Sequence, residues 1–199
     1  MLNVYLLRHG ETTWNADGNR YCGITDVELT EKGLSQAAQA KDLLEGIHFD
    51  AIYSSPLKRA YITATIASGE RMAVVKDPLL LEAAFGQWEG KTRAEFVSED
   101  PELWEQWDKD PGNTRAGATG DTAGEVVERV NRFFEEAAHR HPGGTILVVA
   151  HNTVNRFFLA HKLGMPLKNY RRIFQENSSI TQFTLNNHNE ITLNKLNCR

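Results

Sequence analysis

The chain is poor in cysteine, has no long apolar run and carries no strong excess of either charge. Its two cysteines among 199 residues, Cys22 and Cys198, form neither a metal-type cluster nor a disulfide framework. This scarcity predicts a reducing, cytoplasmic location. The apolar run in MLNVYLLRHGE is too short to cross a membrane and lacks the leader and cleavage site of a signal peptide, so we expect neither feature.

The small net charge of −4 argues against nucleic acid or an anionic membrane as the main partner, because both select a basic face. It is compatible with a small basic pocket. The apolar fraction of 41% and the charged fraction of 24% are ordinary for a globular protein. A length of 199 residues favours one domain over residues 1–199.

Short apolar strands alternate along the chain with amphipathic helices. Strands are predicted at residues 3–8, 51–54, 72–75 and 145–149, and helices at about 30–45, 57–68, 92–107, 122–140 and 153–163. Ser55 and Pro56 predict the start of the second helix, as a hydroxyl cap followed by proline. Alternation over residues 180–196 predicts a C-terminal hairpin. We expect a three-layer α/β/α sandwich with a mostly parallel central sheet and this hairpin at its edge.

Three of the predicted strands end in polar residues. The first ends in Arg8 and His9, the second leads into a helix that carries Arg59, and the fourth ends just before His151. Ligands of open α/β sheets bind at the carboxyl ends of the strands, so these side chains meet in one crevice if the strands are neighbours. Arginine side chains and helix N-termini both bind phosphate. The pattern therefore predicts a phosphate-binding crevice.

Five motifs also resemble those of a known family. They read LLRHGETTWN, GITDVELTEKGLSQA, IYSSPLKRAYITA, LLLEAAFGQWEG and VVAHNTVNRFFLAHKLG, in this order, between residue 4 and about residue 180. They are similar to the histidine phosphatase superfamily, in its cofactor-dependent phosphoglycerate mutase-like branch. The resemblance implies a phosphoglycerate mutase-like fold with a helical insertion at about residues 83–120, here called the lid segment. Its three tryptophans could pack a substrate or pack a helix onto the domain.

The resemblance implies a role for each polar residue at the strand ends. His9 is expected to be the nucleophile and to accept the phosphoryl group as a phosphohistidine. Its ring must be neutral to attack, and neighbouring cations favour the neutral form. The groups expected to bind the phosphoryl oxygens are Arg8, Asn15, Arg59, His151 and the backbone N–H groups from Asn152 onward.

Glu82 matches the family's proton donor, which protonates the departing alkoxide. Glu11, two residues from His9, is the alternative acid. No metal is expected, since the chain has no carboxylate cluster and no His and Cys at metal-ligand spacing.

Three positions depart from the family's pattern. The family often has Gln-Gly where this chain has Cys22-Gly23, a proline at Glu28, and Gly-Gly at Asn152-Thr153. Cys22 and Gly23 are expected in the substrate pocket, where Cys22 could alter substrate preference. The alternative is that Cys22 is a small buried filler.

Two activities and one inactive role are compatible with this site. A phosphatase passes the phosphoryl group to water, whereas a phosphoglycerate mutase returns it to a bound phosphoglycerate and needs 2,3-bisphosphoglycerate as a primer. Mutases of the family tend to be longer and read ERHYG where this chain reads EAAFG at residues 82–86. We therefore expect a phosphatase acting on a small phosphorylated metabolite, and the apolar substitution suggests a substrate with some apolar body. An inactive phospho-ligand binding protein is the third hypothesis.

The exposed hairpin edge could pair two copies as a homodimer.

Overall fold

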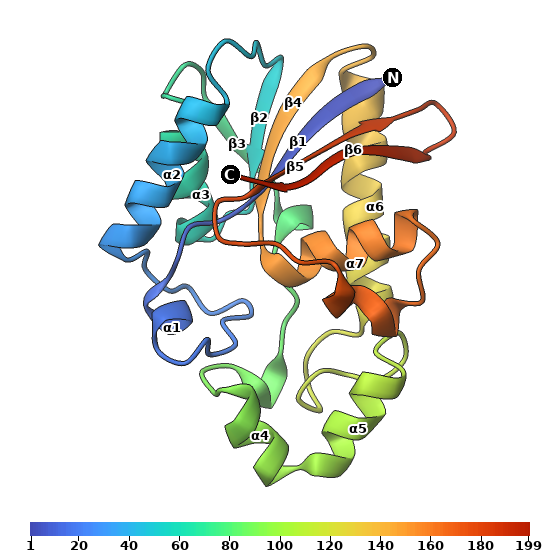
Figure 1. Cartoon of the computed structure of the whole chain (residues 1–199). Helices are drawn as coiled ribbons and strands as arrows, with labels where there is room; N and C mark the ends of the chain where they lie inside the picture. Colours follow the sequence, from blue (N-terminus) through green and yellow to red (C-terminus); the bar gives the residue numbers. More distant parts are fainter.

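A six-stranded mixed sheet forms the centre of the computed structural model, which describes all residues 1–199 (Figure 1). The strands are β1 (Leu2–Arg8), β2 (Ala51–Ser54), β3 (Val74–Lys76), β4 (Thr145–Ala150), β5 (Ile180–Leu185) and β6 (Ile191–Cys198). They lie in the order β3-β2-β4-β1-β5-β6. The first four are parallel, while β5 runs antiparallel to β1, and β6 runs antiparallel to β5. The predicted mostly parallel sheet with a hairpin at its edge is confirmed.

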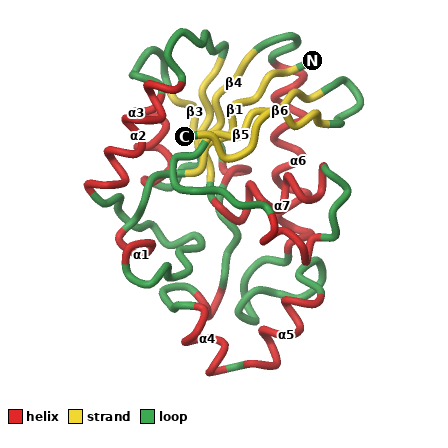
Figure 2. The backbone as a smooth tube through the Cα atoms, viewed as in Figure 1, coloured by secondary structure: helices red, strands yellow, loops and turns green.

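Helices cover both faces of this sheet (Figure 2). The α-helices are α1 (Thr13–Ala16), α2 (Glu31–Leu43), α3 (Lys58–Ala67), α4 (Arg93–Glu99), α5 (Pro101–Lys109), α6 (Ala123–Arg140) and α7 (Asn152–Lys162). The 3₁₀ helices are η1 (Pro78–Leu80), η2 (Gly86–Trp88) and η3 (Leu167–Arg172). Length and hydropathy together leave no helix that could span a lipid bilayer.

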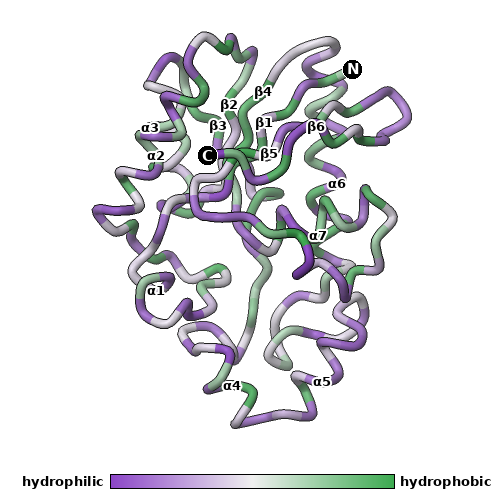
Figure 3. The backbone as a smooth tube through the Cα atoms, in the orientation of Figure 1, coloured by the Kyte–Doolittle hydropathy of each residue, from purple (hydrophilic) through white to green (hydrophobic).

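The two faces of the sheet carry separate cores. Leu6 and Val148 point to the side of α6 and α7, into a cluster of 31 buried residues. Their neighbours Leu7 and Val149 point to the other side, into a cluster of 11 buried residues with α2 and α3. Because side chains alternate along a strand, β1 and β4 must be apolar on both faces. The hydrophobic colouring of these strands in Figure 3 reflects this requirement. The predicted three-layer α/β/α arrangement is confirmed.

The helix after β2 begins later than predicted. Helix α3 starts at Lys58, and its N-cap is Leu57, which makes no side-chain cap hydrogen bond. Instead of capping a helix, Ser55 accepts a weak hydrogen bond from the Leu57 N–H at 3.4 Å. The backbone N–H of Lys58 donates to Asp26 at 2.9 Å. A side chain distant in sequence therefore does the capping that the local motif predicted for Ser55.

The lid segment contains two short helices where the sequence predicts one at about 92–107. Helix α4 ends at Glu99 and α5 begins at Pro101. Proline has no N–H and is suited to the first turn of a helix, and Asp100 caps α5 by accepting from the Leu103 N–H. The chain therefore breaks at this Asp-Pro pair. The helices lie beyond the carboxyl ends of β1 and β4 (Figure 1).

The lid-segment tryptophans pack inward. Trp88 stacks on Phe96 with ring centroids 4.6 Å apart, and Trp104 and Trp107 each lie 5.8 Å from Trp88. All four rings are buried and belong to the same core cluster as α6 and α7. Of the two roles the sequence allowed, these tryptophans pack helices rather than contact a substrate.

Strand β6 lies at one edge of the sheet, and its pairing with a second copy of the chain stays a prediction.

Candidate active site

The parallel pairing of β1 and β4 places two histidines side by side. Arg8 lies opposite Ala150 in the register, and the His9 N–H donates to the Ala150 carbonyl at 3.0 Å. The rings of His9 and His151, one residue beyond each strand, have centroids 5.1 Å apart at 61°. Residues 142 positions apart therefore meet because their strands are neighbours in the sheet.

His9 is held as a neutral imidazole with one free nitrogen. Its Nδ1 lies 2.7 Å from the Gly10 carbonyl oxygen, which can only accept, so Nδ1 carries the hydrogen and donates it. The unprotonated nitrogen is then Nε2. Burial lowers the pKa of His9 well below its usual value, and the nearby guanidiniums of Arg59 and Arg8 lower it further. The sequence predicted the effect of the cations, but burial contributes more.

The strand tip approaches the start of α2 so closely that two glycines are required. A Cβ on Gly10 would lie 2.4 Å from the Gly33 carbonyl oxygen, and a Cβ on Gly33 would lie 2.1 Å from the Glu11 carbonyl oxygen. The Gly10 N–H in turn donates to the Thr63 hydroxyl at 3.0 Å. These contacts fix the backbone on which the His9 ring is held.

Arg59 is completely buried and anchors the second histidine. Its guanidinium donates to the carbonyls of Gly23 and Thr25, both at 2.7 Å, and its Nε donates to Nδ1 of His151 at 3.2 Å. Nδ1 of His151 is therefore an acceptor, so the hydrogen of the neutral ring lies on Nε2. That nitrogen is buried and has no partner. Burial lowers the pKa of His151 well below its usual value, and the charge of Arg59 is the second largest cause of this shift.

Arg8 offers a second unpaired donor. One of its guanidinium nitrogens donates to the Gln175 carbonyl at 2.7 Å, whereas its Nε is buried without a partner. Burial lowers the pKa of Arg8 to about 10, so the side chain remains charged at neutral pH. Together with Nε2 of His151, this leaves two buried donors beside the His9 ring that lack an acceptor. Buried polar groups are normally paired, so this arrangement calls for an anionic ligand.

Glu82 lies at the N-terminus of α7. Its Oε1 accepts the N–H groups of Val154 at 2.8 Å and Ala83 at 3.0 Å, and its Oε2 accepts that of Thr153 at 3.0 Å. Arg129 holds the backbone around it by donating to the Leu79, Leu81 and Glu82 carbonyls. The carboxyl group is therefore fixed in place on both its side-chain and backbone sides.

The alternative acid, Glu11, lies elsewhere. Its carboxylate pairs with Lys32 at 2.7 Å and accepts from the Thr30 hydroxyl at 3.1 Å. The hydrogen bond from Lys32 lowers the pKa of Glu11. Glu11 does not line the pocket that contains His9 and Glu82.

The remaining predicted residues surround this centre. Asn15 lines the pocket while its Oδ1 accepts from the Thr12 N–H at 3.1 Å, which completes the cap of α1. Asn152 begins α7, and its Oδ1 is buried without a partner. Cys22 lines the pocket with its sulfur 3.7 Å from the Thr12 hydroxyl oxygen, and burial raises the pKa of its thiol.

Gly23 does not line the pocket. Its role is to hold Arg59 through its carbonyl, in a left-handed conformation with φ +51°. A Cβ here would lie 1.9 Å from Oε1 of Glu89, whose carboxylate accepts the N–H groups of Ile24 and Thr25. The expected substrate-pocket role of Gly23 is replaced by a supporting one.

Sequence reasoning missed the loop between η3 and β5. The Ser178 N–H donates to the Arg8 carbonyl at 3.0 Å, and the Asn177 amide donates to the His9 carbonyl at 3.1 Å and to Asn15 at 3.3 Å. This loop therefore supports the backbone of Arg8 and His9 and the side chain of Asn15. Its polar sequence, QENSS, is ordinary for a loop and carries no local signal of that role.

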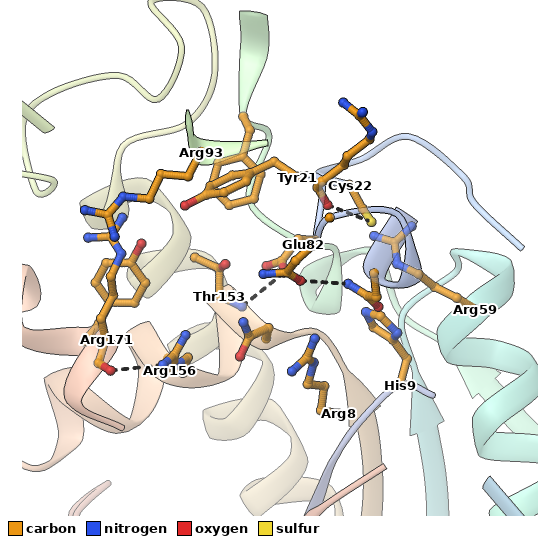
Figure 4. A pocket seen from close by; sticks show the side chains of 17 residues that line it. Arg8, His9, Tyr21, Cys22, Arg59, Glu82, Arg93, Thr153, Arg156 and Arg171 are labelled. Atoms are coloured by element: carbon orange, nitrogen blue, oxygen red, sulfur yellow. Dashed lines mark hydrogen bonds between the residues drawn. The ribbon is translucent and has the colours of Figure 1, made fainter. Parts of the chain in front are cut away.

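One pocket of about 280 Å³ joins the predicted residues Arg8, His9, Asn15, Cys22, Arg59, Glu82 and Asn152 (Figure 4). His151 is fully buried beside His9 and is not among the lining residues. Most of its lining is polar, and six of the lining residues are arginines. Phe85, from the EAAFG stretch, is 3% exposed and packs against Tyr21 with ring centroids 4.7 Å apart. Phe85 also lines the pocket, and the expectation of an apolar substrate body stays a prediction.

Comparison with known proteins shows the family to which this chain belongs. The model of the histidine phosphatase superfamily (branch 1) matches residues 4–199, and the chain belongs to that superfamily. Phosphoserine phosphatase 1 from Hydrogenobacter thermophilus is 34% identical over 198 residues, which cover 99% of this chain and 92% of the relative. The adenosylcobalamin/alpha-ribazole phosphatase of Escherichia coli is 34% identical, covering 83% of this chain and 81% of the relative.

Solved structures agree with the sequence relatives. Phosphoserine phosphatase from Entamoeba histolytica, in complex with 3-phosphoglyceric acid, superposes with a TM-score of 0.89 at 30% identity and covers 100% of this chain and 98% of that chain. The mycobacterial glucosyl-3-phosphoglycerate phosphatase superposes with a TM-score of 0.87 at 28% identity and covers 99% of both chains. The protein is therefore an enzyme, and its relatives are small-molecule phosphatases. This finding argues against the hypothesis of an inactive binding protein.

Proposed function

We propose that this enzyme hydrolyses a small phosphomonoester through a phosphohistidine on His9. The observation that carries the proposal is the His9 ring itself. Its Nδ1–H is committed to the Gly10 carbonyl, and burial with two guanidiniums keeps the ring neutral, so the Nε2 lone pair is available. A covalent intermediate divides one difficult displacement into two easier ones.

In the first step, Nε2 of His9 attacks phosphorus and the ester P–O bond breaks. The free donors of Arg8 and His151 suit the phosphoryl oxygens, whose charge shifts in the loose transition state. Arg59 adds positive charge and holds His151 in the donating tautomer. The leaving alkoxide takes a proton from Glu82, which enters this step as the neutral acid.

In the second step, water attacks the phosphohistidine and the P–N bond breaks. Glu82, now ionised, takes a proton from that water, and His9 returns to its neutral form as phosphate leaves. Oε2 of Glu82 accepts only the Thr153 N–H, so it is the oxygen with room for the transferred proton. One proton leaves Glu82 and one returns in each turnover.

We propose that no metal cofactor takes part, because arginines supply the fixed positive charge that a metal supplies elsewhere. The pocket that holds His9 contains six arginines and a single carboxylate, that of Glu82, which is poor composition for a cation site. A cytoplasmic location is proposed on the two free thiols, Cys22 and Cys198.

The competing activity is that of a phosphoglycerate mutase, which would use the same histidine and need 2,3-bisphosphoglycerate as a primer. One relative at 34% identity is named a probable phosphoglycerate mutase, from Cronobacter sakazakii. Phosphate release from phosphomonoesters is therefore measured beside 2- and 3-phosphoglycerate interconversion with the primer present. Interconversion far faster than phosphate release would favour the mutase over the proposed phosphatase.

Trapping the intermediate tests the chemistry directly. Enzyme mixed with a ³²P-labelled phosphomonoester and quenched in alkali should retain label on the protein, and the label should be lost in acid, as expected of a phosphoramidate. The His9→Ala variant should retain none and should not release phosphate. His188→Asn, at an exposed position of the β5–β6 turn, serves as the control and should label normally. Turnover by His9→Ala at the wild-type rate would exclude the proposal.

A further inference from the structure

The carboxylate of Glu89 takes no part in the proposed chemistry, and all of its partners are uncharged. Glu89 follows η2 and does not line the pocket that contains His9. Its Oε1 accepts the N–H groups of Ile24 and Phe85, both at 3.1 Å, and its Oε2 accepts the N–H of Thr25 at 3.1 Å and the hydroxyl of the same residue. Three of these four donors lie 64 or 65 positions away in the sequence, so the lid segment is joined here to a distant part of the chain.

The distant donors lie on a tight turn over residues 22–25. The Thr25 N–H also donates to the Cys22 carbonyl at 3.1 Å, and Gly23 has a left-handed conformation. In such a turn, successive N–H groups face one side and form a concave site for an anion. Here the anion is the Glu89 carboxylate, which occupies the space that a Cβ at residue 23 would need. A negative charge brought by the lid segment therefore holds this turn in shape.

The opposite side of the same turn holds Arg59. The carbonyls of Gly23 and Thr25 accept from its two terminal guanidinium nitrogens. The Gly23 carbonyl and the Ile24 N–H belong to one peptide group, and in a trans peptide these two bonds point in opposite directions. This peptide group therefore donates to the Glu89 carboxylate and accepts from the Arg59 guanidinium.

The polarity of this peptide group suits both charges. Its positive end faces the carboxylate and its negative end faces the guanidinium, so each hydrogen bond strengthens the other. Arg59 itself has no carboxylate among its hydrogen-bond partners. Burial lowers the pKa of Arg59, and Glu89 is one of the negative groups that oppose this shift. Glu89 is thus a counter-charge for a buried cation with which it forms no ion pair.

The orientation of Arg59 determines which nitrogen of His151 carries the hydrogen. The two turn carbonyls fix the plane of the guanidinium, and its Nε then lies 3.2 Å from Nδ1 of His151. Nε of an arginine can only donate, so Nδ1 must accept and Nε2 keeps the hydrogen that the proposed mechanism directs to a phosphoryl oxygen. A shift of the turn would remove this constraint on the tautomer.

We infer that Glu89 is a positioning residue for phosphoryl transfer: it fixes the turn that holds Arg59, and through Arg59 it keeps His151 in the donating tautomer. The inference rests on the proposed phosphatase activity and adds to it a residue outside the pocket. Loss of one donor to a developing anion costs about 10²–10³-fold in kcat, so a His151 that is only partly released should cost about tenfold.

Replacing Glu89 by glutamine keeps the size of the side chain but removes its charge. The substrate is p-nitrophenyl phosphate, whose leaving group needs no proton from Glu82, so that an effect on the acid through Phe85 is excluded. For this substrate, kcat/KM should fall about tenfold. The inhibition constant of vanadate, which resembles the transition state, should rise by a similar factor, while that of phosphate should change much less.

A spectroscopic readout separates positioning from a merely structural role. In ¹⁵N NMR spectra of histidine-labelled protein, His151 of the wild type should have an unprotonated Nδ1, whereas His9 should show the opposite tautomer. Glu89→Gln should move part of His151 to the Nδ1–H form and leave His9 unchanged. Glu89→Asp keeps the charge and should show a smaller change in both the rate and the tautomer, and it provides the test if Glu89→Gln does not fold.

Glu125→Gln is the matched control. The Glu125 carboxylate also accepts a backbone N–H, that of Thr122 at 2.9 Å, but it lies at the start of α6, pairs with Arg115 and does not line the pocket. This variant should lower the melting temperature without changing the ratio of the vanadate and phosphate inhibition constants or the tautomer of either histidine.

The outcomes separate this inference from the phosphatase proposal. If the wild type releases no phosphate from p-nitrophenyl phosphate, the proposed activity fails, while the tautomer of His151 still tests the role of Glu89. If the wild type is active and Glu89→Gln keeps both its kcat/KM and its His151 tautomer, the inference is refuted. It is equally refuted if vanadate and phosphate binding weaken by the same factor, or if Glu125→Gln reproduces the change of tautomer.

Discussion

Replacing Glu82 by glutamine separates acid catalysis from binding and folding. Glutamine keeps the shape of the side chain but cannot supply a proton to the leaving group. General acid catalysis contributes on the order of 10²–10⁴-fold, so hydrolysis of an alkyl phosphate by Glu82→Gln should fall by about that factor. p-Nitrophenolate leaves without needing a proton, so p-nitrophenyl phosphate should be affected far less.

The hydrogen bonds of Glu82 also predict the cost in stability. Three backbone N–H groups donate to its carboxylate, and a glutamine can offer its carbonyl oxygen only on one side. If that oxygen keeps Val154 and Ala83, the amide faces the Thr153 N–H and leaves it unpaired, which costs about 1–3 kcal/mol. For a domain of this size, each kcal/mol lowers the melting temperature by about 2–4 °C.

Initial rates on both substrates, with thermal melts of the same preparations, complete the experiment. Glu11→Gln is the matched control, since this carboxylate lies two residues from His9 but pairs with Lys32 outside the pocket. Glu11→Gln should hydrolyse both the alkyl phosphate and p-nitrophenyl phosphate at the wild-type rate. The reasoning fails if Glu82→Gln slows both substrates by the same factor, or if Glu11→Gln reproduces the leaving-group effect.

Four further predictions follow from the supporting contacts and the charges. Folding keeps His9 and His151 neutral with lowered pKa values, so the unfolded chain binds more protons below its ordinary His pKa of about 6.5. The free energy of unfolding should therefore fall as the pH drops from 6.5 to 5, with a slope that approaches about 1.4 kcal/mol per pH unit per ring at the acid end. Urea melts across this window should show the decline, and a flat profile contradicts it. Activity measured as kcat/KM should persist as the pH drops through 6.5, because protonation of the His9 ring lies well below that value. Arg129→Met leaves three backbone carbonyls around Glu82 without their donor and should slow alkyl phosphates more than p-nitrophenyl phosphate, whereas equal slowing would indicate a structural role only. Incubation with EDTA followed by gel filtration should leave phosphate release unchanged, and recovery of lost activity by an added divalent ion would contradict the proposed metal-free reaction.

The central strands and their polar ends were predictable because their signals are local. A strand buried on both faces must be apolar throughout, so the change to Arg8-His9 and to His151 at its end stands out in the sequence. Neighbouring positions in the sheet then follow from the fold class. The tautomers could not be predicted in the same way, since they depend on the Gly10 carbonyl and on Nε of Arg59.

Two of the failures have a common physical origin in contacts from distant segments. The start of α3 depends on Asp26, which caps Lys58 from 32 positions away, and no pattern around Ser55 records it. The same holds for Asn177, which supports His9 across 168 positions. The break at Asp100-Pro101 differs, because its local signal was present in the sequence and the longer helical pattern was followed instead.

The place of β1 and β4 in the middle of the sheet has a consequence for how such an enzyme can diversify. Both strands are paired on two edges and covered on two faces, so they belong to the part of the fold that opens least readily, and the His9–His151 pair lies at their ends. The position of the nucleophile thereby depends on the stability of the whole sheet, whereas an exposed pocket residue such as Arg93 of α4 can change with little effect on that sheet. New substrates are accessible to this scaffold without retuning its nucleophile.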